Sequence, residues 1–297
     1  MTQRDKVVVT GGAGFIGSWL VAKLIQEGYQ IVVVDNFSNG DTENLKNFPP
    51  DCLTIITGDV RAPSMFFEEL RNAKCIYHLA CLGLRHSLHS PLENHDVNAT
   101  GTLQLLQAAK KAGVPRFVHV STSEVYGSAI HVPMNENHPT RPATVYGASK
   151  LAGESYARAF HSAGEFDVTV LRPFNAYGPR SHYEGDAGEV IPKFILRILA
   201  GLPAVIFGDG SQQRDFTYVE DIANGIMEAG RTIETAGKTL NLGSGIAISI
   251  RHHKAFLSNP HHRPSRPVAA YATRLNCHGA SFNKISLSFS SLRMCRP

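Results

Sequence analysis

Two short stretches of the chain carry side chains that can move a proton. STSEVYG covers residues 121–127 and sets hydroxyl groups beside the carboxylate of Glu124. VYGASK follows at 145–150, so Tyr146 stands four positions before Lys150. Residues four apart lie on one face of a helix, so the phenol and the ammonium are expected side by side.

A tyrosine beside a lysine can serve as a general base. The pKa of a free tyrosine is about 10, and a neighbouring ammonium and a positively charged nicotinamide both lower it by favouring the phenolate. Tyr146 is then expected to take the proton of a sugar hydroxyl while hydride leaves the same carbon for a nicotinamide cofactor. Thr122 is a candidate for holding or relaying that proton.

A glycine-rich turn precedes these stretches. TGGAGFIG, residues 10–17, follows an apolar run and opens a segment of helical period, where glycines let a pyrophosphate approach a helix N-terminus. A second apolar run ends at Asp35, whose carboxylate can accept both ribose hydroxyls and would repel a 2′-phosphate. This favours NAD over NADP, and Asp59 at the end of the third run is placed to meet the adenine.

The elements that must hold these residues alternate along the chain. Each apolar run is apolar on both faces, which is typical of a parallel sheet covered by helices on both sides. The sequence therefore predicts an α/β fold with a doubly wound parallel sheet of the Rossmann type. Trp19 is expected in the core, and His78 at a strand end with either a structural role or a cofactor contact. The expected strands are 6–10, 30–35, 53–60, 74–80, 116–122 and 167–173, and the expected helices are 15–28, 94–113 and 146–164.

The pattern loosens after Asn175. A loop, an amphipathic helix and short strands around turns come before a helix and a strand return. This favours a smaller substrate-binding part beside the NAD-binding domain. The NAD-binding Rossmann domain is expected to cover 1–175 and 209–245, and the substrate-binding part 176–208 and 246–297.

Residues 251–297 differ from the rest of the chain in charge and period. They hold eight Lys or Arg and no acidic residue, whereas residues 1–250 carry 21 basic and 25 acidic side chains. We expect this atypical tail to be disordered, as after a shifted reading frame, and to leave the substrate-binding part incomplete. Its basic residues are scattered, so no nucleic-acid partner is expected. Its His-His pairs lack a further ligand, so no metal site is expected either.

Composition fits a soluble globular protein. The 297 residues are 43% hydrophobic and 18% charged, and the apolar runs are much shorter than the roughly 20 residues that cross a bilayer. No secretory signal is evident before the first apolar run, so the cytoplasm is the expected location and no membrane partner is expected. Five cysteines without C-x-x-C pairs are expected to be reduced, with Cys75 and Cys81 buried as small hydrophobes.

Six motifs occur in the order TGGAGFIG, GDV, STSEVYG, YGASK, LRPFNAYGPR and RDFTYVED. Together they resemble the extended short-chain dehydrogenase/reductase family, the nucleotide-sugar epimerases and dehydratases such as UDP-glucose 4-epimerase, over residues 6–250. The resemblance implies tight binding of NAD(H), oxidation of a nucleotide-sugar at C4 and return of the hydride after an intermediate step. It also implies a homodimer formed through the helices expected at 94–113 and 146–164.

The resemblance also assigns roles to single residues. It implies that Asn175 contacts the substrate diphosphate and that Arg214 grips a phosphate, for which a guanidinium fork is suited. The expected catalytic residues are Thr122, Tyr146, Lys150 and Glu124, and the expected substrate contacts are Ser123, Asn175 and Arg214. The expected cofactor contacts are Gly11, Gly14, Phe15, Ile16, Gly17, Asp35, Asn36, Asp59, Val60, Leu79, Ala80, Asn98, Ser121, Tyr146, Lys150 and Pro173.

The step after oxidation depends on position 123. In family dehydratases this stretch resembles S-T-D-E, whose aspartate protonates the departing hydroxyl; Ser123 removes that acid and ranks dehydration lower. S-T-S-E-V-Y-G also resembles family UDP-glucuronate decarboxylases, for which Arg85 and Arg180 are the candidates to grip a uronate carboxylate. Epimerisation demands least, so a UDP-sugar 4-epimerase is the leading hypothesis. The alternatives are a UDP-glucuronate decarboxylase, a 4,6-dehydratase and a catalytically impaired NAD-binding protein.

Overall fold

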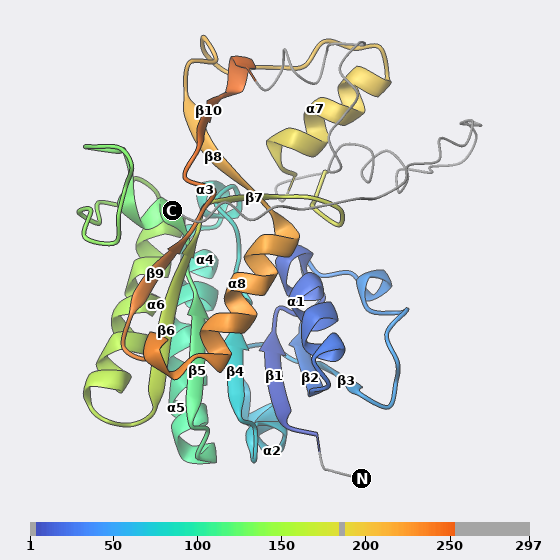
Figure 1. Cartoon of the computed structure of the whole chain (residues 1–297), viewed down its shortest axis with the longest axis vertical. Coiled ribbons are helices and arrows are strands. Elements are labelled where there is room, and N and C mark those ends of the chain that lie inside the picture. The colour runs from blue at the N-terminus through green and yellow to red at the C-terminus, as the bar shows by residue number, and fades with distance from the viewer. Residues whose placement is uncertain (1–3, 184–187, 253–297) are drawn as a thin grey trace.

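The computed structural model describes residues 4–183 and 188–252 (Figure 1). Strands and helices alternate from the start of the chain, as expected. The strands are β1 (Lys6–Thr10), β2 (Gln30–Asp35), β3 (Leu53–Thr57), β4 (Cys75–His78), β5 (Arg116–Val120), β6 (Asp167–Pro173), β7 (Asn175–Tyr177), β8 (Gln213–Tyr218), β9 (Thr239–Leu242) and β10 (Ala247–Ser249). The helices are α1 (Phe15–Gln26), α2 (Phe67–Leu70), α3 (His86–His89), α4 (Pro91–His95), α5 (Thr102–Ala112), α6 (Val145–Ser162), α7 (Val190–Leu199) and α8 (Val219–Arg231). The 3₁₀ and π turns are η1 (Thr42–Asn44), η2 (Pro63–Phe66), η3 (Asp96–Gly101), η4 (Ser123–Tyr126) and η5 (Ile233–Thr235).

A seven-stranded sheet forms the centre of the larger part. Its strand order is β3-β2-β1-β4-β5-β6-β9, and every neighbouring pair is parallel. The order reverses between β1 and β4, which is the switch point of a doubly wound sheet, where ligands bind beyond the carboxyl ends of the strands. The predicted Rossmann sheet is confirmed.

Helices cover both faces of this sheet. α1 and α8 pack together over one face, and α2, α5 and α6 lie on the other (Figure 1). Leu20, Val33 and Ile226 belong to the first core, while Val32 and Leu105 belong to the second. Successive strand residues point to opposite faces, so a strand between two helical layers must be apolar at every position. This accounts for the uninterrupted apolar run in β2.

A second, three-stranded sheet lies at the carboxyl edge of the first. β8 pairs antiparallel with β10 and parallel with β7, and α7 shares a core with Phe216 of β8 (Figure 1). The predicted boundaries of the two parts remain a prediction. Within 209–245, however, β8 belongs to the small sheet, and the chain returns to the large sheet with β9.

Three segments differ from the sequence-based expectations. Ile55 of β3 is 44% exposed because β3 is the edge strand. The expectation that β3 is buried on both faces is therefore wrong. The helix expected at 94–113 consists of α4, the π-helical η3 and α5, with the Thr102 hydroxyl donating to the Asn98 carbonyl at 2.7 Å. β7 stands where a loop is expected, because it pairs with β8. The expectations for residues 253–297 lie outside the described residues.

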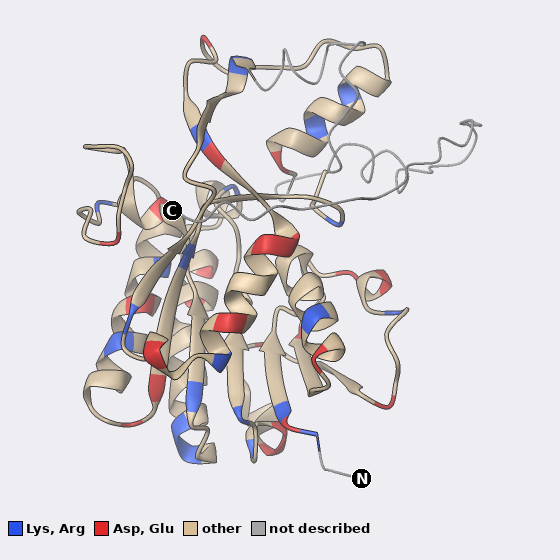
Figure 2. Cartoon of the chain, viewed as in Figure 1, with Lys and Arg blue, Asp and Glu red and all other residues tan. Residues whose placement is uncertain are grey.

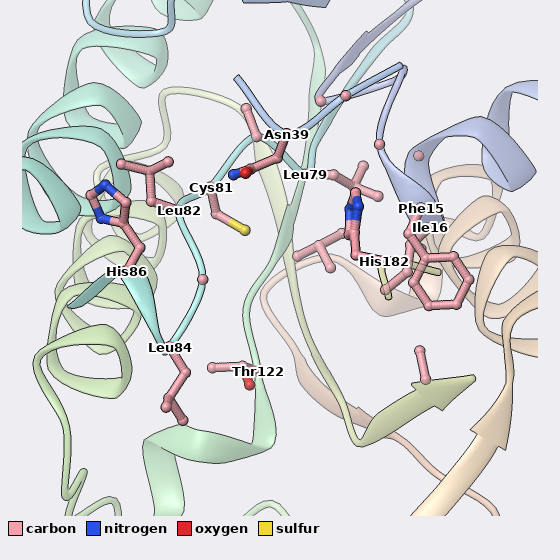
Figure 3. A pocket seen from close by; sticks show the side chains of 18 of the residues that line it. Phe15, Ile16, Asn39, Leu79, Cys81, Leu82, Leu84, His86, Thr122 and His182 are labelled. Atoms are coloured by element: carbon pink, nitrogen blue, oxygen red, sulfur yellow. The ribbon is translucent and has the colours of Figure 1, made fainter. Parts of the chain in front are cut away.

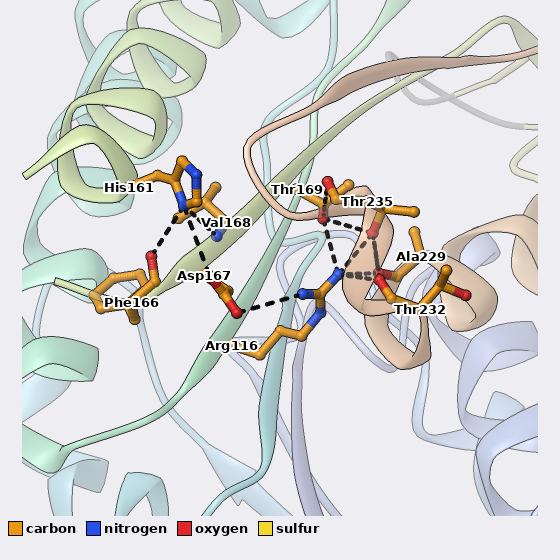
Figure 4. A network of polar contacts seen from close by, with 9 residues as sticks. All are labelled: Arg116, His161, Phe166, Asp167, Val168, Thr169, Ala229, Thr232 and Thr235. Carbon is orange, nitrogen blue, oxygen red and sulfur yellow. Dashed lines mark hydrogen bonds and ion pairs between the residues drawn. The ribbon is translucent and has the colours of Figure 1, made fainter. Parts of the chain in front are cut away.

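A buried arginine joins the C-terminal end of α8 to the sheet. Nη2 of Arg116 lies within 3.2 Å of four oxygens: the hydroxyls of Thr169 and Thr235 and the carbonyls of Ala229 and Thr232 (Figure 4). Carbonyls at the end of a helix have no intrahelical partner, and a cation there also complements the helix dipole. Arg116 therefore fixes the position of α8 against β5 and β6.

We expect Arg116→Met to lower the free energy of unfolding by about 2 kcal/mol, because buried carbonyls lose a charged donor. Urea unfolding followed by circular dichroism measures the change. Arg71→Met is the matched control, since Arg71 lies on the surface and pairs with Glu68 at 3.0 Å, and such pairs contribute about 0–1 kcal/mol. Equal, small losses in the two variants would contradict the role given to Arg116.

Charged side chains of both signs are distributed over the described part of the chain. Figure 2 shows Lys and Arg interspersed with Asp and Glu on the helices and at the strand ends. Within residues 4–183 and 188–252, none of the helices combines the length and the apolar character that crossing a bilayer requires.

Candidate active site

A cleft of about 970 Å³ opens at the carboxyl edge of the large sheet, where the small sheet meets it (Figure 3). Loops that follow β1, β2, β3, β4, β5 and β6 all contribute to its walls, as expected at a switch point. It thus brings together residues far apart in the sequence. The sequence-predicted residues that line it are Gly11, Gly14, Phe15, Ile16, Gly17, Asp35, Asn36, Asp59, Val60, Leu79, Ala80, Ser121, Thr122, Glu124, Tyr146, Pro173, Asn175 and Arg214.

The glycine-rich turn brings the N-terminus of α1 to the cleft. The Gly11 N–H donates to the Val34 carbonyl at 2.9 Å, which fixes the turn against β2. A Cβ on Gly17 would overlap the Gly11 carbonyl and lie 2.9 Å from the Cα of Gly12, so turn and helix meet without a side chain between them. α1 has no side-chain cap and no acidic residue in its first turn. Its free N–H groups suit a diphosphate.

Asp35 ends β2 beside this turn. Its Oδ2 accepts the Ala13 N–H and its Oδ1 accepts the Phe37 N–H, both at 2.9 Å. Burial raises the pKa of Asp35, and these two N–H groups act in the opposite direction. Each carboxylate oxygen has a second lone pair, so the group can still accept the ribose hydroxyls for which it is predicted.

Asp59 is held more tightly. Arg61 donates to both of its oxygens, from Nε at 3.0 Å and from Nη2 at 2.7 Å, and Asn36 donates to Oδ2 at 3.1 Å. The hydrogen bonds from Arg61 are the main reason that the pKa of Asp59 is lowered to about 2. A carboxylate that stays ionised and is fixed in this way can accept hydrogen bonds from the polar edge of a cofactor.

Thr122, Glu124 and Tyr146 line the same cleft. The Thr122 hydroxyl oxygen caps η4 by accepting the Glu124 N–H at 3.2 Å. Tyr146 enters from the first turn of α6, which Thr144 caps by accepting the Gly147 N–H at 3.1 Å. Lys150 lies one turn deeper, fully buried, and its Nζ donates to the Val120 carbonyl at 2.7 Å. The expected common helix face is present, with the phenol toward the cleft and the ammonium beneath it.

The pKa expected for Tyr146 needs correction. In the structure burial raises the pKa of this phenol; Cys81 and Glu124 act in the same direction, and only Thr122 opposes them. Because a positively charged nicotinamide favours the phenolate, ionisation of Tyr146 is expected to depend on the bound cofactor.

Asn98 and Ser123 do not line the cleft. Asn98 is fully buried, accepts the Leu82 N–H at 2.8 Å and donates to the Leu82 carbonyl at 2.9 Å and to Ser149 Oγ at 3.2 Å. In this structure it therefore holds the loop after β4 against α6 and makes no wall of the cofactor site. Its expected contact with the cofactor remains a prediction that this geometry does not support.

His78 and Trp19 have structural contacts. His78 is fully buried between the hydroxyls of Thr10 at 2.7 Å and Thr102 at 2.9 Å, and burial lowers its pKa to about 3. It is therefore neutral and joins β4 to β1 and α5. Trp19 is partly buried and packs against the core that lies under α1 and α8, and its Nε1 donates to the Pro179 carbonyl at 3.0 Å.

The loop after β4 supplies cleft residues that the motifs did not reveal. Leu82, Leu84 and His86 line the cleft, and Cys81 points its sulfur into it (Figure 3), so this thiol is not a buried core group. His182 joins them from the segment after β7. The sequence contained a usable signal for the residues after β4, because loops that follow parallel strands meet at one edge of the sheet.

The two arginines proposed for a uronate carboxylate are both engaged. Arg85 lines the cleft and donates from Nη1 to the Gly188 carbonyl, next to Glu189. Burial raises the pKa of Glu189 to about 8, and Arg85 acts against that rise. Arg180 lies over the ring of Trp19, 5.1 Å from its centre, and does not line the cleft.

A model of the NAD dependent epimerase/dehydratase family matches residues 7–243. The chain belongs to this family. The match spans the glycine-rich turn, Asp35 and the pair of Tyr146 and Lys150. Membership makes the chain an enzyme of an NAD-dependent family, and the geometry fits that cofactor because α1 presents free N–H groups at a turn whose glycines leave room for it.

Relatives in the family differ in the reaction that they catalyse. UDP-glucose 4-epimerase from Mycolicibacterium smegmatis is 34% identical over 267 residues, which are 88% of this chain and 84% of that protein. UDP-glucuronic acid decarboxylase 1 from Arabidopsis thaliana is 37% identical over 76% of this chain, which spans about half of that protein, 52%. The crystal structure of DesIV, a dTDP-glucose 4,6-dehydratase from Streptomyces venezuelae with NAD and TYD bound, has a TM-score of 0.79 and 34% identity over 85% of this chain and 80% of that one. Relatives that are 34% to 37% identical to this chain thus carry the names of three different activities.

Proposed function

We propose that the protein is an NAD-dependent 4-epimerase of a UDP-hexose. The observation that supports the proposal is that one cleft is lined both by Thr122, Glu124 and Tyr146 and by the glycine-rich turn and Asp35. Epimerisation at C4 needs a base and a hydride acceptor, and it does not need an additional acid. The match to a 4-epimerase over 84% of that relative's length supports this choice.

The chain's own residues would act on the proton of the C4 hydroxyl. NAD, when bound, supplies the acceptor and later the donor of the hydride. Tyr146 takes the hydroxyl proton as the hydride leaves, Thr122 hydrogen-bonds the same oxygen, and Lys150 supports the negative charge of the phenolate from below. The oxidised sugar would turn in the cleft, and Tyr146 would return the proton to the C4 oxygen.

Two observations argue against the other reactions. Dehydration needs an acid for the departing hydroxyl, and Ser123 neither supplies one nor lines the cleft. Decarboxylation needs a grip on the uronate carboxylate, and Arg85 donates to a backbone carbonyl beside the carboxyl group of Glu189.

The homodimer and the cytoplasmic location remain predictions.

The test is to incubate the protein and NAD with UDP-glucose, UDP-N-acetylglucosamine and UDP-glucuronate separately and to follow the anomeric protons by NMR. We expect a new anomeric signal of an intact hexose from UDP-glucose or UDP-N-acetylglucosamine. A pentose product would contradict the proposal and indicate decarboxylation. A 4-keto-6-deoxy product would contradict it and indicate dehydration. Ser123→Asp is the informative variant, since gain of dehydration would show what the serine withholds.

A further inference from the structure

A buried carboxylate stands behind the catalytic pair. Glu154 lies on α6 one turn after Lys150 and two turns after Tyr146, so all three share a helix face. It is 0% exposed and does not line the cleft, so it cannot touch a substrate or cofactor there. A charged side chain is almost never fully buried unless it is paired. The partners of Glu154 therefore indicate which elements it holds together.

Arg172 of β6 is the main partner of Glu154. It donates from Nε to Oε1 at 2.9 Å and from Nη2 to Oε2 at 2.7 Å, the two-pronged geometry of the strongest charge-assisted pairs. Arg158 adds a third hydrogen bond to Oε2 at 2.8 Å. Burial acts to raise the pKa of Glu154, but the hydrogen bonds and charge of Arg172, together with Ser121 and Arg158, outweigh it and leave this pKa lowered, so Glu154 stays ionised. The pair fixes α6 on the central sheet.

The same arginine reaches the segment that carries Thr122. Its Nη1 donates to the Tyr126 hydroxyl at 2.9 Å, and its guanidinium lies 4.7 Å from the centre of that ring. Tyr126 ends η4, the turn that Thr122 caps, and its hydroxyl donates to Asn241 Oδ1 of β9 at 2.7 Å. One buried network therefore connects the helix of Tyr146 with the turn that presents Thr122.

The charge of Lys150 depends on its buried surroundings. Burial lowers the pKa of this ammonium, whereas Cys81 and Glu154 raise it. Two imidazoles also face it from β4 and β5, those of His78 and His119, and burial lowers the pKa of both so that they are neutral. Glu154, four positions after Lys150 on α6, is thus an ionised carboxylate on the same helix face as the ammonium.

We propose that Glu154, held by Arg172, is a positioning residue that keeps Lys150 charged and Tyr146 aligned with Thr122. The inference rests on the proposed function for the roles of Tyr146 and Lys150. It goes beyond that function because neither Glu154 nor Arg172 lines the cleft, so neither would touch a substrate or cofactor there. The same device would serve any reaction that starts with a phenolate at Tyr146.

The decisive variant is Glu154→Gln, which keeps the size of the side chain and removes its charge. Loss of a nearby negative charge lowers the pKa of Lys150, so the ammonium is lost at a lower pH. We expect kcat to fall at least tenfold, and the alkaline limb of its pH profile to move to lower pH, with KM for the nucleotide-sugar little changed. Glu154→Asp keeps the charge and is expected to keep the alkaline limb in place even where kcat falls.

Glu165→Gln is the matched control, because Glu165 lies just beyond α6 on the surface, 2.6 Å from Lys110. It is expected to leave both kcat and the pH profile unchanged. Urea unfolding of all variants separates loss of fold from loss of positioning. A Glu154→Gln protein that is less stable but keeps the wild-type alkaline limb would overturn the proposal and leave Glu154 a structural residue.

A direct readout separates this inference from the proposed function. The titration of Lys150 can be followed by NMR in protein labelled with ¹³C at lysine Cε, with the signal assigned from its loss in Lys150→Arg. A lower pKa of Lys150 in Glu154→Gln supports the inference even if no UDP-sugar is converted, which would count against the 4-epimerase alone. An unchanged pKa of Lys150 overturns it even in an active enzyme.

Discussion

Tyr146→Phe is expected to lower kcat for the interconversion of the UDP-hexoses by about 10³-fold. The variant keeps the ring that lines the cleft and removes the hydroxyl that we propose exchanges a proton with the substrate, and positioned proton transfer contributes about 10² to 10⁴-fold. Binding of NAD and of the nucleotide-sugar should change little, because the ring still fills its place. Steady-state rates from the NMR assay, with binding constants from calorimetry, measure both effects.

Tyr156→Phe is the control for this substitution. Tyr156 lies on the same helix, α6, and packs against the core on the far side of the sheet from α1. Loss of its hydroxyl should leave kcat within a factor of about two of the wild type, as expected for a change away from the site. If Tyr146→Phe kept more than a tenth of the wild-type kcat, another group would have to carry the proton.

Gly17→Ala is expected to weaken NAD binding by about 10- to 100-fold. The added Cβ would overlap the Gly11 carbonyl and approach Gly12, and these are backbone atoms that cannot turn aside. Overpacking of this kind costs about 1–3 kcal/mol, and each 1.4 kcal/mol is tenfold in affinity. Calorimetric titration with NAD gives the loss of affinity, and urea unfolding gives the loss of stability.

Gly83→Ala is the matched control for the glycine turn. Gly83 also lines the cleft, in the loop after β4, but a Cβ at this position meets no atom within 4 Å among the described residues. NAD affinity should remain within a factor of about two. Equal affinities of the two variants for NAD would show that the turn at Gly17 yields to a side chain and does not shape the cofactor site.

Much of the fold follows from the local pattern of the chain. Strands packed between two helical layers are apolar at every position, and this made β1, β2, β4, β5 and β6 recognisable together with helices α1, α5 and α6. The glycine spacing and Asp35 could be assigned for the same kind of reason. A tight turn at a helix N-terminus and a carboxylate at the end of the next strand are local features that bind a dinucleotide's pyrophosphate and ribose. The nearness of Tyr146 to Lys150 followed from helix periodicity alone.

Other features depend on contacts between distant segments. The sequence could not show that β8 joins a small sheet with β7 and β10, because short polar strands find their partners through tertiary packing. It also could not show that Asn98 holds the loop after β4, or that burial raises the pKa of Tyr146, since both depend on what surrounds a side chain in space. The sequence by itself determined the strands and helices of the parallel sheet, the glycine-rich turn and the common helix face of Tyr146 and Lys150, because each rests on a local pattern along the chain. Only the tertiary structure decided that Glu154 and Arg172 stand behind that pair, because a buried charge is tolerated where a partner from another strand meets it.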